Sequence, residues 1–168
     1  MIFRPLLSFL LLLASPVPAE TVSVPVSDQG WSIEMDAPAF EKKSGSDQGP
    51  NYVYNANSGR FNLSFFVEPK AGGNSHRECF EHYWPMASRN PLIDKSTIRI
   101  SHTDRYYRVA YDIIVPPKPP YGPLAHRNVN YFFAFEDKWV DVHISIIKPE
   151  AADAKLLEAF DEGLKYGR

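Results

Sequence analysis

The sequence has almost no cysteine and no excess of positive charge, and these scarcities exclude several classes of protein. Its 168 residues include one Cys, 18 Lys plus Arg and 20 Asp plus Glu, which gives a formal charge of −2 at pH 7. A disulfide-stapled scaffold needs several cysteines, and a nucleic-acid-binding domain is normally basic. Because 44% of the residues are hydrophobic, the chain is also too apolar to be disordered. We therefore expect a packed core and no nucleic-acid partner.

Long apolar runs are absent except near the N-terminus. Arg4 precedes an apolar run at residues 6–14, and the small-residue sequence Val17-Pro18-Ala19 follows it. This three-part pattern predicts a signal peptide at residues 1–19, since the run is too short to span a bilayer. We expect cleavage near Ala19 to release residues 20–168 as a single domain, periplasmic or secreted, with no transmembrane segment in the mature chain.

The rest of the sequence is dominated by alternating apolar and polar residues. In the strongest example, Phe61, Leu63, Phe65 and Val67 alternate with polar neighbours, which is typical of a half-buried strand. The same reasoning predicts strands at residues 21–26, 31–35, 51–57, 60–68, 96–102, 105–115, 128–136 and 138–147. The polar, breaker-rich residues 41–50 are predicted to be a surface loop.

Two segments have the periodicity of amphipathic helices. Residues 75–78 (SHRE) form a capping box, and the apolar residues between Cys79 and Ala87 fall on one arc. Pro85 predicts a kink or an early end of this first helix. Residues 151–165 predict a closing helix, with an apolar stripe at Leu156, Phe160 and Leu164. The order of elements predicts an α+β fold: an antiparallel sheet of about six or more strands with two main helices packed on it.

Three features together suggest a family. The strand RFNLSFFVEP is followed by the capped helix at Ser75, long strand pairs come next, and the ending HISIIKPEAADAKLLEAFDEGL passes from a strand through Pro149 into an amphipathic helix. Between residues 21 and 168, this order resembles the PsbP-like and DcrB-like extracytoplasmic proteins. The resemblance implies a PsbP-like sandwich and an accessory or binding role. It implies no common catalytic set, so it assigns no role to any single residue.

The first predicted helix contains the sequence His76-x-x-Cys79-x-x-His82. Residues three apart share a helix face, as two metal ligands must. The two histidines, however, lie about 120° apart around the helix axis, so one ion would be strained to contact all three residues. The alternative is a core cysteine between a helix-capping and a surface histidine. We expect no metal and no cofactor, and we keep these three residues as the metal candidates.

Asp141 and His143 alternate with apolar residues in the strand predicted at 138–147, on its outward side. A histidine beside a carboxylate can act as a general base, and His102 and Asp104 are candidate neighbours from another hairpin. No serine occupies a nucleophile-elbow pattern. The alternative is a solvated sheet face on which polar residues have no chemical role.

The proline-rich residues 116–123 (PPKPPYGP) predict a stiff, extended loop that loses little entropy when a partner binds it. Nearby basic and aromatic groups would supply the contacts, and the partner-binding candidates are Lys118, Tyr121, His126 and Arg127. The alternative is a rigid connection between two strands, in which proline restricts the unfolded chain.

Five aromatic residues lie out of phase with the predicted buried alternation: Tyr52, Tyr54, Phe66, Tyr106 and Phe132. If one sheet face is uncovered, they would form an exposed aromatic patch that marks a partner site. If helices cover both faces, they belong to the core. We expect the second arrangement, because two helices are available.

These observations predict an exported, non-catalytic binding or accessory protein of the bacterial-type cell envelope. It would act through contacts with another protein or an envelope component, and an inhibitor or immunity protein is one version. The alternative is a small periplasmic metal-binding protein or hydrolase that uses a His/Cys or His/Asp cluster.

Overall fold

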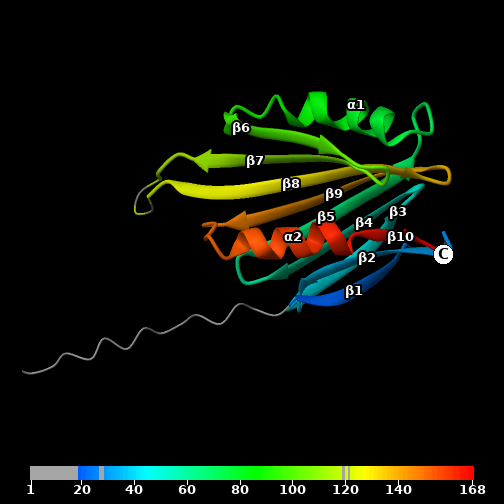
Figure 1. Ribbon diagram of the computed structural model, residues 1–168, viewed down its shortest axis with the longest axis horizontal. Coiled ribbons are helices and arrows are strands. Elements are labelled where there is room, and N and C mark those ends of the chain that lie inside the picture. The colour runs from blue at the N-terminus through cyan, green and yellow to red at the C-terminus, as the bar shows by residue number, and fades with distance from the viewer. Residues whose placement is uncertain (1–18, 27–28, 119, 121) are drawn as a thin grey trace, which may run out of the picture.

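The computed structural model describes residues 19–26, 29–118, 120 and 122–168 (Figure 1). The predicted signal peptide, apart from Ala19, and Tyr121 lie outside the described residues. The elements follow in this order: β1 (Ala19–Val26), β2 (Trp31–Pro38), β3 (Lys42–Gln48), β4 (Asn51–Ser58), β5 (Phe61–Pro69), α1 (His76–Ala87), β6 (Ile93–His102), β7 (Tyr107–Val115), β8 (Leu124–Phe135), β9 (Lys138–Ile147), α2 (Asp153–Gly163) and β10 (Lys165–Gly167).

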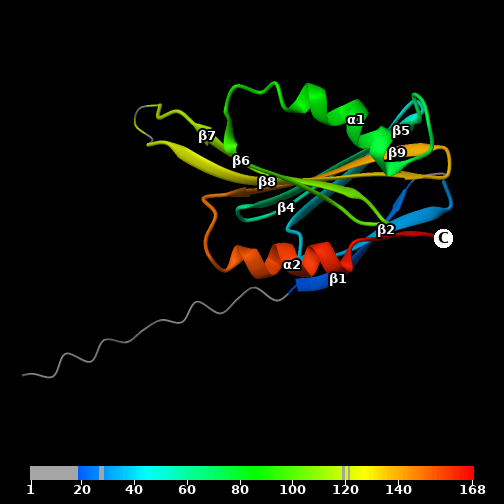
Figure 2. The same cartoon turned by 45° about the horizontal axis from the view of Figure 1, so that its top comes forward.

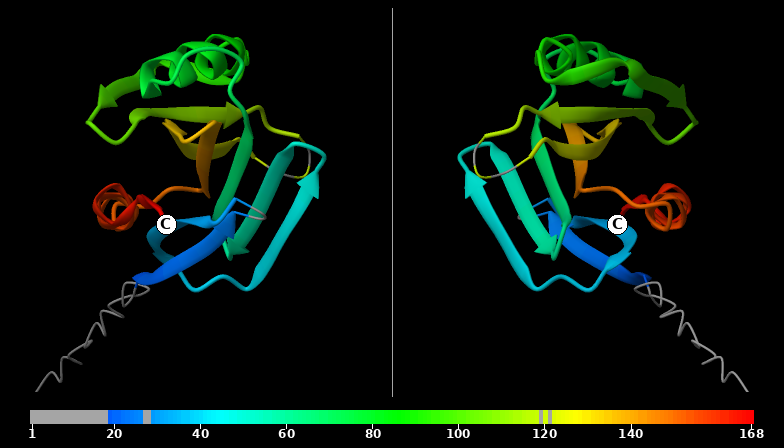
Figure 3. Two further views of the ribbon diagram at one scale, coloured as in Figure 1. Left: turned by 90° about the vertical axis from the view of Figure 1, so that its right-hand side faces the viewer. Right: turned by 90° about the vertical axis from the view of Figure 1, so that its left-hand side faces the viewer.

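The strands form two antiparallel sheets. Seven strands pair in the order β3-β4-β5-β9-β8-β7-β6, and three pair in the order β1-β2-β10. Figure 3 shows the larger sheet turning along its width, so that β3 and β4 stand steeply to β6 and β7. The predicted α+β class with an antiparallel sheet and two helices is confirmed, although strands make up more of the chain than expected.

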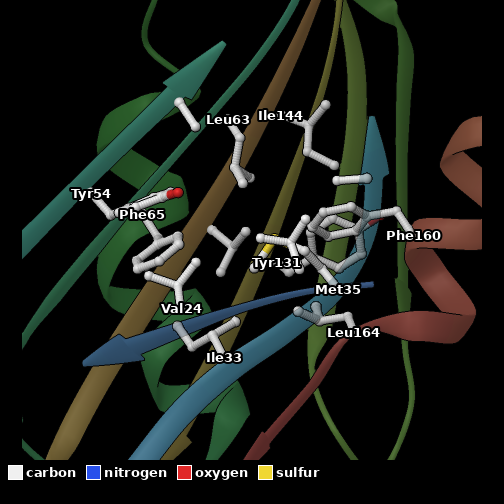
Figure 4. Packing of buried hydrophobic residues seen from close by; sticks show 14 of the residues in the cluster. Val24, Ile33, Met35, Tyr54, Leu63, Phe65, Tyr131, Ile144, Phe160 and Leu164 are labelled. Carbon is white, nitrogen blue, oxygen red and sulfur yellow. The ribbon is translucent and has the colours of Figure 1, made fainter. Parts of the chain in front are cut away.

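The main core lies between the two sheets. Alternate residues of β5 and β9 point into it, and Met35, Tyr131 and Phe160 are among its fully buried side chains (Figure 4). Helix α2 contacts β2 and adds Leu157 and Phe160 to this core. The small sheet and α2 together cover one face of the large sheet (Figure 2).

Helix α1 packs on the opposite face of the large sheet, against β8, β7 and β9 (Figure 2). Its capping box is present as predicted: the Glu78 backbone N–H donates to Ser75 Oγ at 3.2 Å, and the Ser75 backbone N–H donates to Glu78 Oε2 at 3.0 Å. The helix includes Pro85 and ends two residues later, at Ala87, which agrees with the end expected near this proline. Pro85 is exposed near the last turn, where its missing N–H leaves one carbonyl to solvent.

The loop predicted at residues 41–50 is instead strand β3, paired with β4 along its whole length. Every β3 side chain is exposed, so the hydrophobic alternation that marks a half-buried strand is missing from its sequence. Short polar edge strands of this kind also resist unwanted pairing with other chains. The closing helix stops at Gly163, and the chain then pairs with β2 as β10.

The five out-of-phase aromatic residues do not form one exposed patch. Tyr54, Tyr106 and Phe132 are buried, and Tyr52 and Phe66 are partly buried. Tyr54 and Tyr106 join the core between the sheets, whereas Phe132 joins the cluster beneath α1. The expectation that they are core residues is confirmed for the three buried ones.

Candidate functional site

Helix α1 is too short to cover the face on which it packs. Its 12 residues span about 18 Å, whereas the 10 residues of β9 span about 33 Å. The cluster of buried residues beneath α1 includes Cys79, Trp84, Phe132 and Trp139. Beyond the C-terminal end of α1, the same sheet face is open.

Two adjoining cavities of about 580 and 360 Å³ lie on this open half of the face. They share Asn55, Ser64 and His143, so they form one continuous depression across β4, β5 and β9. We call this depression the polar groove. Its polar floor consists of Asn55, Asn57, Asn62, Ser64, His143 and Ser145 from the cavity walls, with Asn130 and Asp141 at the end nearest α1.

The strand register arranges these residues in two parallel rows. In the first row Asn55 is opposite Ser64, Ser64 is opposite His143, and His143 is opposite Asn130. The second row continues through Asn57, Asn62, Ser145 and Asn128 in the same strand order. Because neighbouring strands lie about 4.8 Å apart, each row presents evenly spaced polar groups over four strands.

Hydrogen bonds fix the two buried asparagines of β8. Asn130 accepts a hydrogen bond from Tyr111 Oη at 3.0 Å and donates one to Asp141 Oδ1 at 2.8 Å. Asn128 donates to the His126 carbonyl at 3.2 Å, and its Oδ1 lies 3.1 Å from His143 Nε2. These side chains therefore cannot turn freely, and the β8 side of the groove is preorganised.

The two ionisable groups on the floor are both shifted toward their neutral forms. Burial raises the pKa of Asp141 to about 7, against a smaller opposing effect of the Asn130 hydrogen bond. Burial also lowers the pKa of His143 to about 4. Near neutral pH His143 is uncharged. Its Nε2 then donates to Asn128 Oδ1, which can only accept, and this leaves Nδ1 as an acceptor.

The β4 and β5 side of the groove is less engaged. Among the described residues, the side chains of Asn55 and Ser64 have no hydrogen-bond partner within the protein. Asn55 is exposed and Ser64 is partly buried. The groove thus pairs a fixed wall on β8 with unpaired donors and acceptors on β4 and β5.

The candidate metal ligands of α1 do not meet at one point. The Cys79 thiol is fully buried, 3.5 Å from the Val140 carbonyl, and burial raises its pKa. His76 Nδ1 accepts the Ala134 backbone N–H at 3.0 Å, while His82 is exposed, with Nε2 3.7 Å from Glu68 Oε1. In the part of the chain that the structure describes, no three His, Cys, Asp or Glu residues are placed to hold a metal ion.

The structure separates His102 and Asp104 from Asp141 and His143. The strand order β9-β8-β7-β6 places His102 in one row with Tyr107, Phe132 and Asp141, three strands away from Asp141. That separation is about 14 Å. His102 stacks on Tyr107 instead, with ring centroids 5.1 Å apart.

The candidate partner-binding residues are divided between different surfaces. Lys118 is exposed, and Tyr121 is not among the described residues. His126 faces the groove side of β8, where Nδ1 lies 3.4 Å from Ser145 Oγ and Nε2 is buried without a partner among the described residues. Arg127 faces the opposite side and forms an ion pair with Asp112, with Nε and Oδ1 3.2 Å apart.

The groove asparagines are functional candidates that the sequence-based reasoning missed. Asparagine is depleted in strands because its side chain competes for backbone hydrogen bonds. Asn55, Asn62, Asn128 and Asn130 nevertheless all lie inside strands. That anomaly, repeated over three strands, was the signal available in the sequence.

No family model and no curated protein matches the chain. A solved structure from Bacteroides thetaiotaomicron superposes with a TM-score of 0.47 and 6% sequence identity, covering 81% of this chain and 45% of that one. The chain therefore spans less than half the length of that structure, and a likeness of this degree indicates neither fold nor function. Among the described residues, no helix is long and apolar enough to cross a membrane.

Proposed function

We propose that this is an exported binding protein of the cell envelope, and that it holds a small polar ligand in the polar groove. The observation that carries the proposal is the pair of polar rows on a sheet face that α1 leaves uncovered. A sheet face that only meets solvent has no need of buried, hydrogen-bonded asparagines, because water can satisfy any polar side chain there. The hydrogen-bonded asparagines of β8 would hold a ligand in one orientation, and the unpaired donors and acceptors on β4 and β5 would bind its polar groups.

The size of the groove supports the same function. The larger cavity, of about 580 Å³, falls within the range of ~300–1,000 Å³ that is typical of small-molecule sites. Its rim is formed by β3 on one side and by the C-terminal end of α1 on the other. Export to the periplasm and a PsbP-like sandwich remain parts of this proposal, supported by the N-terminal leader pattern and by the order of elements.

Hydrolysis in the same groove is the second candidate, and one observation favours it. An aspartic acid with a pKa of about 7 can both donate and accept a proton near neutral pH, as a general acid or base must. Ser64 and Ser145 lie on the same floor. Against it, no hydrogen bond joins either serine to Asp141 or His143 among the described residues. Ser145 Oγ lies 3.4 Å from His126 Nδ1 instead, and His126 Nε2 has no partner among the described residues that would orient the ring as a general base.

Thermal-shift measurements on the full chain test the binding proposal. The probes are amino acids, nucleotides, neutral sugars and uronic acids, each in excess. We expect at least one class to raise the melting temperature of the wild type. The variant Ser64→Phe, which fills the floor of the groove, should not respond. Equal responses of both proteins would contradict the groove as the binding site.

The hydrolase candidate has its own test. Chromogenic esters and glycosides would be incubated with the wild type and with Asp141→Asn. Turnover that is lost in the variant would favour catalysis over simple binding, and the absence of turnover with every substrate class would leave binding as the function.

A further inference from the structure

We propose that the ligand of the polar groove is an uncharged, polyhydroxylated molecule, namely a neutral oligosaccharide laid across β4, β5, β9 and β8. This inference rests on the proposed function, since it names the ligand class for the same site. It follows from three properties of the groove: the type of hydrogen-bonding groups on its floor, the lack of a fully charged group on that floor near neutral pH, and the aromatic rings at one end.

The hydrogen-bonding groups on the floor match hydroxyl groups. Each asparagine offers a carbonyl acceptor and an NH₂ donor, and each serine hydroxyl both donates and accepts. A sugar hydroxyl likewise donates one hydrogen bond and accepts others. Asn55, Ser64 and His143 present such groups in one row, repeated strand by strand at about 4.8 Å. A chain of hydroxylated rings can therefore meet a complementary group at each strand.

The interior of the groove disfavours charge of either sign. Asp141 bonds only the neutral Asn130 there and has no cationic partner among the described residues. His143 bonds only the neutral Asn128. An anionic ligand would face this carboxyl group. A cationic ligand would find a single carboxyl group among the lining residues of the two cavities, and that group is only partly ionised near pH 7 because burial raises its pKa to about 7.

Charged side chains do occur at the outer rim, on β3. Lys42 and Lys43 both line the larger cavity. Lys42 is opposite Asn57, and Lys43 Nζ lies 5.9 Å from the centre of the Phe40 ring. Both lysines are exposed, so their charges stay hydrated and attract an anion in the groove only weakly. The lysine charges therefore do not outweigh the preference of the groove floor for an uncharged ligand.

Aromatic rings close the end of the groove nearest α1. Phe66 and Tyr111 line the smaller cavity together with Asn130 and Asp141. Tyr111 is held by its hydroxyl hydrogen bond to Asn130 and by Trp84, whose ring centre is 5.4 Å away. A pyranose ring has an apolar C–H face besides its hydroxyl edge. One sugar can therefore pack on the partly exposed Phe66 ring while its hydroxyls reach Asn55 and Ser64, which line the same cavity.

Isothermal titration of the full chain with defined probes tests this inference. The neutral probes are gluco-, manno- and galacto-oligosaccharides of two to six units, and the charged probes are oligouronates and chitosan oligomers. We expect at least one neutral series to bind with a Kd between about 1 µM and 1 mM, and to bind at least tenfold more tightly than the charged probes.

A double variant locates the binding. Asn55→Ala/Ser64→Ala removes two unpaired groups from the floor, both free of partners among the described residues, and should weaken binding of the neutral oligosaccharide at least tenfold. The control Ser46→Ala/Asn51→Ala changes the same residue types on β3 and β4 outside the groove and should leave the Kd unchanged.

The outcomes separate the ligand class from the site. If a charged probe binds more tightly than every neutral one, and the groove variant weakens it, the ligand class is wrong but the groove remains a binding site. If a neutral oligosaccharide binds equally to the wild type and the groove variant, both proposals fail. If no neutral oligosaccharide binds, this inference is overturned, and the proposed function stands or falls on its thermal-shift test.

Discussion

The two halves of one sheet face have opposite chemistry, although the same strands build both. Beneath α1, β8 contributes Phe132 and Ala134 and β9 contributes Trp139. One step further along the same side of β8 come Asn130 and Asn128, both buried and hydrogen-bonded. The change coincides with the end of α1. Residues that are covered by the helix gain from being apolar, and residues beyond it can serve another purpose.

The comparison indicates how stability and function are divided on this face. Apolar burial contributes about 25 cal/mol per Å², so the covered half adds directly to stability. A hydrogen bond in the groove gains only about 1 kcal/mol net, and a buried group left unpaired loses more than that. The polar half is therefore not explained by stability, which agrees with a role in binding.

The largest contrast is expected between Phe132→Ala and Asn55→Ala. Phe132 is fully buried beneath α1 and packs on Phe80 and Tyr83. Its loss should lower the free energy of unfolding by about 3–5 kcal/mol, through lost burial and the cavity left behind. Asn55 is exposed in the groove, so its replacement should change stability by about 0.5 kcal/mol or less. Urea denaturation measures the free energy of unfolding of both variants. Similar losses in the two variants would contradict the assignment of stability to the covered half of the face alone.

The second contrast concerns the carboxyl group on the floor of the groove. Since the pKa of Asp141 is about 7 in the folded protein and its ordinary value is 3.8, the folded state holds the proton more tightly. Ionisation therefore costs stability as pH rises from about 4 to 7, and the cost is fully present above pH 7. Asp141→Asn keeps an acceptor for Asn130 and removes this cost. We expect it to stabilise the protein by about 2 kcal/mol at pH 8, since one pKa unit corresponds to about 1.4 kcal/mol and the groove remains open to solvent.

The pH profile decides whether this explanation is correct. The gain of Asp141→Asn over the wild type should shrink steadily as pH falls toward 4. Asp137→Asn, at the exposed turn between β8 and β9, is the matched control. A gain that is the same at pH 4 and pH 8 would show that packing, not ionisation, separates the variant from the wild type.

His143 should show the opposite pH dependence. Its pKa is lowered to about 4 from 6.5, so the unfolded chain takes up a proton between these values and the folded protein does not. Wild-type stability from this group is present above pH 6.5 and is lost as pH falls toward 4. The variant His143→Gln has no imidazole to protonate and so does not lose this stability. As pH falls from 7 to 5, the stability of the variant relative to the wild type should rise by about 1 kcal/mol. A flat difference over this range, measured by urea denaturation, would contradict a buried neutral imidazole.

The sequence was informative where side chains alternate and uninformative where they do not. The β5 pattern and the Ser75 capping box predicted their elements well, because burial on one face and a local hydrogen bond leave direct traces in the sequence. Strand β3 was missed because backbone pairing with β4 holds it, and pairing of that kind leaves no mark on exposed side chains.

The candidate site was recovered only in part. Asp141 and His143 were selected from their alternation along β9, but their true neighbours come from β8 and β5. The strand order places β8, not β6, beside β9, and strand order depends on long-range packing. The length of α1 relative to the strands decides which part of the face stays open, and periodicity alone does not predict which strands the helix crosses.

The last prediction concerns Tyr111, at the boundary between the two halves. The Tyr111 ring packs against Trp84 in the covered half, while its hydroxyl donates to Asn130 Oδ1 in the groove. Tyr111→Phe keeps the ring and leaves the Asn130 carbonyl without this donor, which should cost about 1 kcal/mol. Tyr111→Ala also removes the ring and should cost about 3–5 kcal/mol. Denaturation curves give the free energy of unfolding of both variants. The loss in Tyr111→Phe measures the contribution of the hydroxyl in the groove, and the additional loss in Tyr111→Ala measures that of the ring in the core. Equal losses would mean that the hydroxyl, and hence the groove network, carries the stability that we assign to packing beneath α1.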